Sequence, residues 1–247
     1  MRRMNRTPVL ILTAAAAAIS LAIAVPSLTF AGGGDDDRDR NRDNRIVSLD
    51  RRVDHRTYGE WTEAWWQWAT AFAPDVNPVF DLDGANAGQG QSGPVWFLAG
   101  TFGGTAVRNV EIPADKYLLL PLANGEWDTV PGFANPLGLP DPPSVADLRD
   151  ILAYGTDDTS VNCAIDGLEV RHPRSFRVRS PVFSMNFDAD FASAVGYPVE
   201  YVRTAVSDGF WLMLKPLAAG SHTIHFTAEN PVTGFALDVT YNITVTP

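Results

Sequence analysis

The sequence is almost without cysteine, since Cys163 is the only one among 247 residues. A single thiol excludes an intrachain disulfide scaffold, a zinc site built from several cysteines and a CxxC redox centre. Cys163 lies in an apolar segment beside Asn162. We therefore expect a buried, unreactive thiol, and a catalytic nucleophile is the alternative.

Basic residues are also few, because 19 Lys and Arg stand against 29 Asp and Glu, for a formal net charge of −10. Nucleic acid and anionic membrane surfaces both require a basic patch, so this balance argues against either as a partner. Charged residues make up only 19% of the chain, which contains 20 glycines and 18 prolines. This composition is typical of a turn-rich β protein rather than a helical bundle.

Familiar catalytic and cofactor motifs are missing from the sequence. There is no GxSxG serine, and His222 and His225 are three apart in a predicted strand, where they face opposite sides. The glycine-rich run 84–93 lacks the GK[ST] ending of a P-loop, so we predict a flexible loop there. Residues 81–86 have the acidic spacing of a calcium loop, but the EF-hand pattern fails and favours a polar turn. We predict neither a metal site nor a cofactor.

One long apolar run is present, at the amino terminus. Three arginines precede apolar residues 8–25, and small residues stand at 29 and 31. This is the layout of a secretory signal peptide over 1–31, with an uncleaved membrane anchor as the alternative. After cleavage no membrane span is expected, and the protein would be secreted or periplasmic.

The segment after the predicted cleavage site contains no apolar side chain. Residues 32–45 read GGGDDDRDRNRDNR, and such a composition cannot offset the entropy of ordering. We predict a disordered charged linker over 32–45, followed by a single β-sandwich domain over 46–247.

Aromatic residues recur with helical spacing early in this domain. In a helix predicted over 56–72, five of them share one face within roughly 80°. They are Tyr58, Trp61, Trp65, Trp68 and Phe72. We expect that face to be buried. Trp66 points away from it, near Glu63, either as an exposed indole that stacks on a sugar or as a ring packed under the loop 84–93.

Most of the remaining chain predicts strands. A second, short helix is expected from Ser144, with Asp147 completing its cap, to Gly155. Asp166-Gly167 predicts a tight hairpin, and residues 235–246 alternate apolar and polar side chains. Other short apolar runs lie at 94–99, 107–112, 117–122, 161–165, 168–170, 176–187, 210–214 and 222–228. Without a βαβ rhythm, we predict an antiparallel β-sandwich, jelly-roll or immunoglobulin-like, with the tryptophan-rich helix packed on it.

The last hairpin allows a predicted register. Symmetrical pairing across a six-residue loop, 229–234, places Phe226 opposite Leu237 and His225 opposite Asp238. The histidine and aspartate form either a surface ion pair or a carboxylate-oriented histidine beside a site. His225 is for that reason a candidate catalytic residue.

Four strings of residues stand out along the chain. They are YGEWTEAWWQW at 58–68, GPVWFLAGTFGG at 93–104, LPLAN at 120–124 and DGFWLMLKPLAAGSHTIHF at 208–226. Together they resemble a family of secreted, signal-peptide-bearing bacterial proteins of unknown function, over residues 55–247. The resemblance implies secretion and a shared fold, and it brings no established activity. Members of that family tend to carry two cysteines near the positions of Ala87 and Val110, which this chain lacks.

Two carboxylates and a tryptophan follow the apolar strand predicted at 117–122. Glu126 and Asp128 could serve glycoside hydrolysis, which uses paired carboxyl groups about 5–10 Å apart. The alternative is a solvated turn. Trp127 lies between them and is a candidate ligand-binding residue together with Trp66 and Glu63.

Three functions remain open at this point. The favoured hypothesis is a non-catalytic binding or envelope protein that holds a polysaccharide or cell-envelope component through an aromatic surface. The first alternative is a carbohydrate-active hydrolase or lyase that uses Glu126 and Asp128. The second is a subunit of an extracellular matrix or filament, assembled by strand addition at an open sheet edge.

Overall fold

The structure, a computed structural model, describes residues 43–131 and 137–247. The predicted signal peptide and most of the predicted linker lie outside the described residues. Arg45 forms an ion pair with Asp43 and donates a hydrogen bond to the Ile165 carbonyl at 2.8 Å. Arg45 thus contacts the domain, ahead of the predicted start at residue 46.

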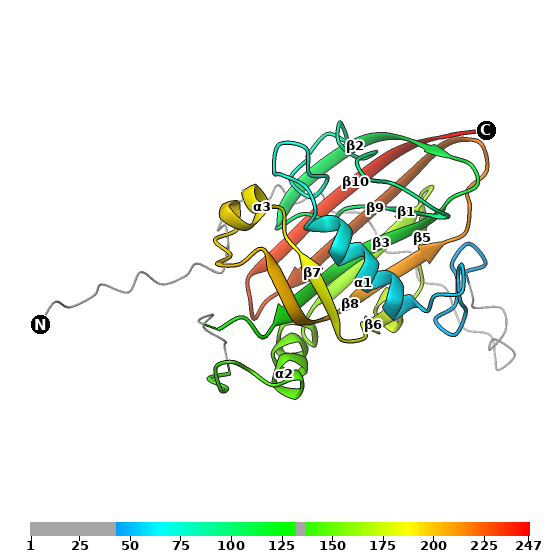
Figure 1. The fold of residues 1–247 in the computed structure, drawn as a ribbon. Helices are drawn as coiled ribbons and strands as arrows, with labels where there is room; N and C mark the ends of the chain where they lie inside the picture. The colour runs from blue at the N-terminus through cyan, green and yellow to red at the C-terminus, as the bar shows by residue number, and fades with distance from the viewer. Residues whose placement is uncertain (1–42, 132–136) are drawn as a thin grey trace, which may run out of the picture.

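The chain forms two five-stranded sheets (Figure 1). The first sheet has the order β1-β3-β8-β6, and β7 also pairs with β8. Its strands are β1 Val95–Phe97, β3 Tyr117–Asp128, β6 Arg177–Arg179, β7 Phe183–Asn186 and β8 Tyr201–Leu214. The second sheet has the order β2-β10-β9-β4-β5. Its strands are β2 Gly104–Pro113, β4 Ser160–Ile165, β5 Leu168–Glu169, β9 Gly220–Asn230 and β10 Phe235–Thr246.

The predicted mainly β fold is confirmed, but the prediction of purely antiparallel sheets was wrong. The pairs β1–β3 and β2–β10 are parallel. The chain leaves the first sheet after β1, forms β2 in the second sheet, and returns as β3 in its original direction. Parallel neighbours need such a crossover, which the short apolar runs of the sequence did not reveal.

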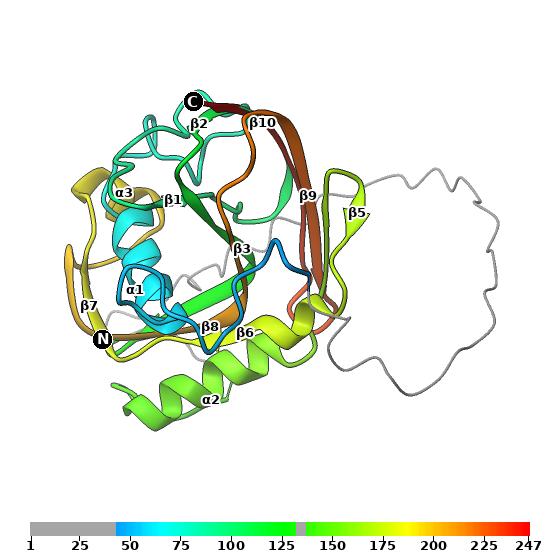
Figure 2. The same ribbon diagram turned by 90° about the vertical axis from the view of Figure 1, so that its right-hand side faces the viewer.

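The first sheet lies between two packed layers, and Figure 2 shows α1 and β9 on opposite sides of β3. One side shares a core with the second sheet, to which Leu120, Leu212 and Phe226 contribute. The opposite side carries Leu119 and Trp211, which pack beneath α1. Alternate residues of the same strands therefore serve two separate cores.

The tryptophan-rich helix, α1 Tyr58–Ala69, has its predicted face buried. Thr57 and Glu60 form a capping box at its start, so the helix begins two residues later than predicted. It also ends before Phe72, which is half-buried beyond the helix. The four stripe residues within the helix are buried, as expected from their spacing: Tyr58, Trp61, Trp65 and Trp68.

Two further α-helices are described where one was expected. The Ser144–Asp147 cap is confirmed, and α2 Val145–Thr156 continues through Gly155, the residue predicted to end it. The third helix, α3 Ala189–Ala194, was not predicted, although Asp188 caps it with its side chain. In the part of the chain that the structure describes, no helix has the length and apolarity needed to span a membrane.

The two predicted hairpins have different outcomes. Asp166-Gly167 is confirmed as the turn between β4 and β5, with positive φ values of 53° and 74°. The predicted register of the β9–β10 hairpin was wrong by two residues, since Phe226 pairs with Val239. The Asn230 side chain accepts hydrogen bonds from two following backbone N–H groups and shortens the loop. Because the shift is even, every side chain keeps its predicted face.

An arginine occupies a core-facing position of β2. Arg108 lies between Ala106 and Val110 on the buried side of the strand and is 1% exposed. Its guanidinium donates to the carbonyls of Asp81, Ala99 and Gly100 and to the Tyr241 hydroxyl. These bonds hold the long connection between α1 and β2 against the second sheet.

Candidate functional site

A bulge in β3 positions the residues of the candidate site. Before the bulge at Pro121/Ala123, even-numbered residues such as Leu120 face the second sheet. After it, the alternation is reversed, and even-numbered residues face α1. The bulge therefore turns three polar side chains away from the shared core, namely those of Asn124, Glu126 and Asp128.

The predicted carboxylate pair shares this face, while the tryptophan between them does not. Glu126 lies opposite Ser207 of β8, and Asp128 lies opposite Ala205. Trp127 points to the other side, where it packs with Leu148 and Leu152 of α2 and Val206 of β8. The structure therefore brings Glu126 and Asp128 together and separates Trp127 from them.

Five side chains on the α1-facing side have an enclosed polar atom without a hydrogen-bond partner among the described residues. We call them the Glu126 cluster, and the atoms are Trp66 Nε1, Asn124 Oδ1, Glu126 Oε1, Ser207 Oγ and Trp211 Nε1. The sixth such atom in the same part of the chain, Trp96 Nε1, belongs to the core between the sheets. Most unsatisfied buried groups of the described chain are thus gathered on one face.

Burial also changes the acidity of the carboxyl groups on this face. It raises the pKa of Glu126 well above its usual range, and the nearby Asp128 charge adds to the effect. Burial raises the pKa of Asp128 to about 6, although Asp128 accepts a hydrogen bond from the Val130 N–H at 2.6 Å. The Tyr197 hydroxyl also donates to Asp128. Burial therefore favours the protonated, neutral form of Glu126.

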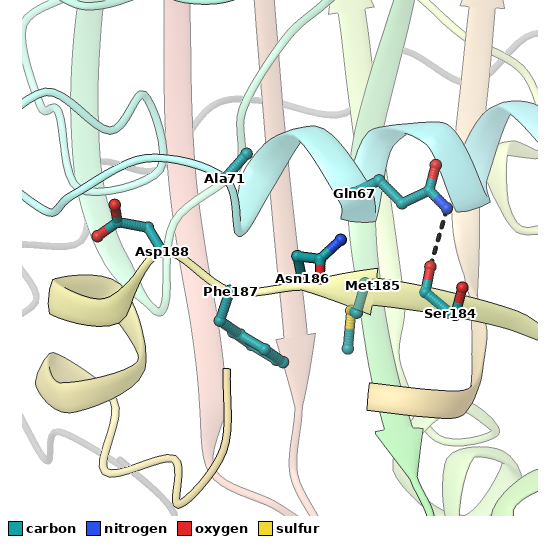
Figure 3. Close-up of a pocket in the computed structure, with 7 residues that line it drawn as sticks. All are labelled: Gln67, Ala71, Ser184, Met185, Asn186, Phe187 and Asp188. Atoms are coloured by element: carbon teal, nitrogen blue, oxygen red, sulfur yellow. Dashed lines mark hydrogen bonds between the residues drawn. The ribbon is translucent and has the colours of Figure 1, made fainter. Parts of the chain in front are cut away.

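A surface cavity of about 510 Å³ lies between the end of α1 and β7 (Figure 3). It is lined by Gln67, Ala71, Ser184, Met185, Asn186, Phe187 and Asp188. Gln67 donates to the Ser184 carbonyl, and Thr70 donates to the Asn186 carbonyl, both at 2.9 Å. These bonds fasten α1 to β7. In Figure 3 the Asn186 amide points toward the helix, whereas Phe187 points away from it.

Glu63 and Trp66, the two predicted binding residues of α1, do not line this cavity but contact residues that do. Gln67 lines the cavity and also donates to Glu63 at 3.4 Å, and burial raises the pKa of Glu63. Trp66 is half-buried and packs against the cluster that includes Met185 and Phe187. The loop 84–93 instead receives Trp68, whose Nε1 donates to the Gln89 carbonyl at 2.9 Å.

His225 lies apart from both features. Its Nε2 is 2.9 Å from an Asp238 carboxylate oxygen on the exposed face of the second sheet, although Thr240 is its register partner. The shared core separates this pair from the Glu126 cluster, and neither residue lines the cavity. The structure does not bring His225 together with Glu126.

The other residues considered for chemistry have structural roles. Burial would raise the pKa of Asp81, but backbone N–H groups of Asp83, Gly84 and Asn86 outweigh it and lower that pKa, as in the predicted polar turn. Cys163 is buried, and burial raises the pKa of its thiol to about 12. Within residues 43–131 and 137–247, no group of three potential metal ligands is present.

Four residues of the cavity and of the Glu126 cluster were not predicted, because a single amide or hydroxyl side chain belongs to no sequence motif. They are Gln67, Asn124, Asn186 and Ser207. Only Asn124 had a signal, since it begins a polar segment directly after an apolar strand. The remaining three are placed by tertiary packing.

No family model, curated protein or solved structure matches this chain. The resemblance of its tryptophan-rich strings to a secreted family stays a prediction. Function is therefore argued from the geometry of the site, because fold alone does not determine it.

Proposed function

We propose that this protein is a secreted or periplasmic, non-catalytic binding protein whose ligand is a carbohydrate or other hydroxyl-rich component of the cell envelope. The observation that carries the proposal is the cavity between α1 and β7. Its volume of about 510 Å³ is within the range typical of small-ligand pockets. A jelly-roll or immunoglobulin-like sandwich belongs to the same proposal and is supported by the core that the two sheets share.

The lining of the cavity suits a ligand with many hydroxyl groups. Gln67 and Asn186 supply amides, Ser184 a hydroxyl and Asp188 a carboxylate. Such groups both donate and accept hydrogen bonds, as a sugar does. Phe187 and Met185 also line the cavity, but both are buried and pack with Phe183 and Phe191. Glu63 extends the polar rim through its contact with Gln67.

The two alternatives receive less support. For the hydrolase, Glu126 and Asp128 share a face and burial raises the pKa of Glu126, but Asp128 is only 3% exposed and bound to Tyr197. For the filament, β2 is the longest edge strand, and backbone bonds from Val107 and Asn109 to the loop at 82–83 cover part of its edge.

The test is a titration of the purified protein with cell-wall fragments and oligosaccharides by calorimetry. Asn186→Ala removes an amide that faces the cavity, and it should weaken binding about tenfold, which corresponds to about 1.4 kcal/mol. Asn162→Ala, on the exposed face of the second sheet, is the matched control and should bind as the wild type does. Equal affinities for the two variants, or no binding of any such ligand, would overturn the proposal.

A further inference from the structure

The unpartnered polar atoms of the Glu126 cluster are unfavourable for the stability of the folded protein. A buried polar atom without a partner destabilises the folded state by about 1–3 kcal/mol. Ser207 and Trp211 are 0% exposed, so bulk water does not reach their unpartnered Oγ and Nε1 atoms. In native structures such groups have a reason, commonly a bound molecule.

The polar atoms of the cluster restrict the chemistry of that molecule. The two indole N–H groups only donate, the Asn124 Oδ1 only accepts, and the Ser207 hydroxyl does both. A metal cation would meet the indole donors. An anion would meet the carboxylate of Asp128, which shares this face. A small uncharged molecule that both donates and accepts hydrogen bonds suits the donors and the acceptors of the cluster together.

The cluster extends from partly exposed residues to fully buried ones. Asn124, Glu126 and Trp66 are half-buried as residues, although their unpartnered atoms are enclosed. Ser207 and Trp211 lie deeper, at 0% exposure. The polar atoms thus run from the half-buried rim formed by α1 and β3 to the buried strand β8.

We propose that the Glu126 cluster is an internal binding site for small uncharged hydroxyl-bearing molecules, of which water is the smallest. The site is separate from the surface cavity and does not depend on the proposed function. Glu126 and Ser207, paired across β3 and β8, are its central ligands, and the indoles of Trp66 and Trp211 donate to the bound molecule.

The occupant is tested by a high-resolution crystal structure of the purified protein together with native mass spectrometry. Electron density within hydrogen-bond distance of Glu126 and Ser207 supports the proposal. An added mass then identifies an organic hydroxyl compound, and the mass of the bare chain identifies water. A site without density, or one occupied by a metal ion or an anion, would overturn it.

A pair of serine variants gives an independent test. Ser180 is buried like Ser207, but its hydroxyl is bonded to the Pro181 carbonyl and the Ser207 N–H. If the Ser207 hydroxyl binds a guest, Ser207→Ala and Ser180→Ala should both lower the Tm. If Ser207 has no guest, Ser207→Ala relieves an unsatisfied group and raises the Tm, and the proposal fails.

Discussion

Two groups of buried polar side chains lie on the α1-facing side of the first sheet, and they differ in how their hydrogen bonds are made. The indoles of Trp61, Trp65 and Trp68 donate to the carbonyls of Val53, Leu98 and Gln89 at 2.8–2.9 Å. The indoles of Trp66 and Trp211 have no partner among the described residues. Ring burial is common to both groups, so the hydrogen bond is what distinguishes a packing residue from a candidate ligand.

Buried charged side chains elsewhere among the described residues are well satisfied. Arg108 is harder to bury than any indole, yet carbonyl groups and the Tyr241 hydroxyl bind its guanidinium. Asp208 is 0% exposed and is paired with Arg177 and Arg179. Among the described residues these buried charges are satisfied, and Trp96 Nε1 is the one unpartnered buried side-chain atom outside the cluster.

The largest expected effect separates the two groups of tryptophans. Trp65→Ala removes a buried ring and a hydrogen bond, and it should lower the free energy of unfolding by about 3–5 kcal/mol. Trp66→Ala should cost less, since the ring is half-buried and its N–H is unbonded. Urea denaturation measures both variants. Equal losses would remove the distinction between the groups.

A smaller effect concerns the pH dependence of stability. The pKa of Asp128 is raised to about 6 in the folded state, so between pH 4 and 6 the folded protein keeps a proton that the unfolded chain loses. Stability should therefore fall as the pH rises through this range, by about 2–3 kcal/mol at 1.4 kcal/mol per pKa unit.

Asp128→Asn isolates this contribution, because its amide oxygen can still accept from the Val130 N–H. The difference in unfolding free energy between wild type and variant should change between pH 4 and 6 and stay level above that range. Parallel curves over the whole range would show that Asp128 is not perturbed by burial.

The smallest effect is expected at an exposed pair. His225 and Asp238 are about half exposed, with side-chain exposures of 46% and 54%. His225→Ala should therefore lower the free energy of unfolding by less than about 1 kcal/mol at pH 6. A larger loss of unfolding free energy, measured by urea denaturation, would mean that exposed polar pairs stabilise this fold as much as buried ones.

Local signals in the sequence predicted the local structure well. The stripe on α1, the cap at Ser144 and the Asp166-Gly167 turn depend on neighbouring residues and were confirmed. The parallel pairing of β2 with β10 was not predictable in this way, because it joins segments more than a hundred residues apart. The register of β9 and β10 also depended on the side chain of Asn230, which alternation does not report.

The candidate site was predicted only in part. Glu126 and Asp128 were recognised by residue type, and the structure places them on one face. Alternation along an unbroken β3 would have directed them into the shared core, and the bulge reverses that direction. Nothing in the sequence marks Ser207 and Asn186 as site residues. Their positions at the site depend on the packing of the neighbouring strands and α1.

Arg108 has a consequence for the dynamics of the chain. Its bonds to Asp81, Ala99 and Gly100 come from one guanidinium on β2, so the connection 81–100 cannot separate from the second sheet by breaking a single contact. Opening of this connection exposes a charge and several carbonyls at once and is therefore cooperative with opening of β2. In hydrogen exchange, the two ends of this connection, near Asp81 and near Ala99 and Gly100, would then open together with β2.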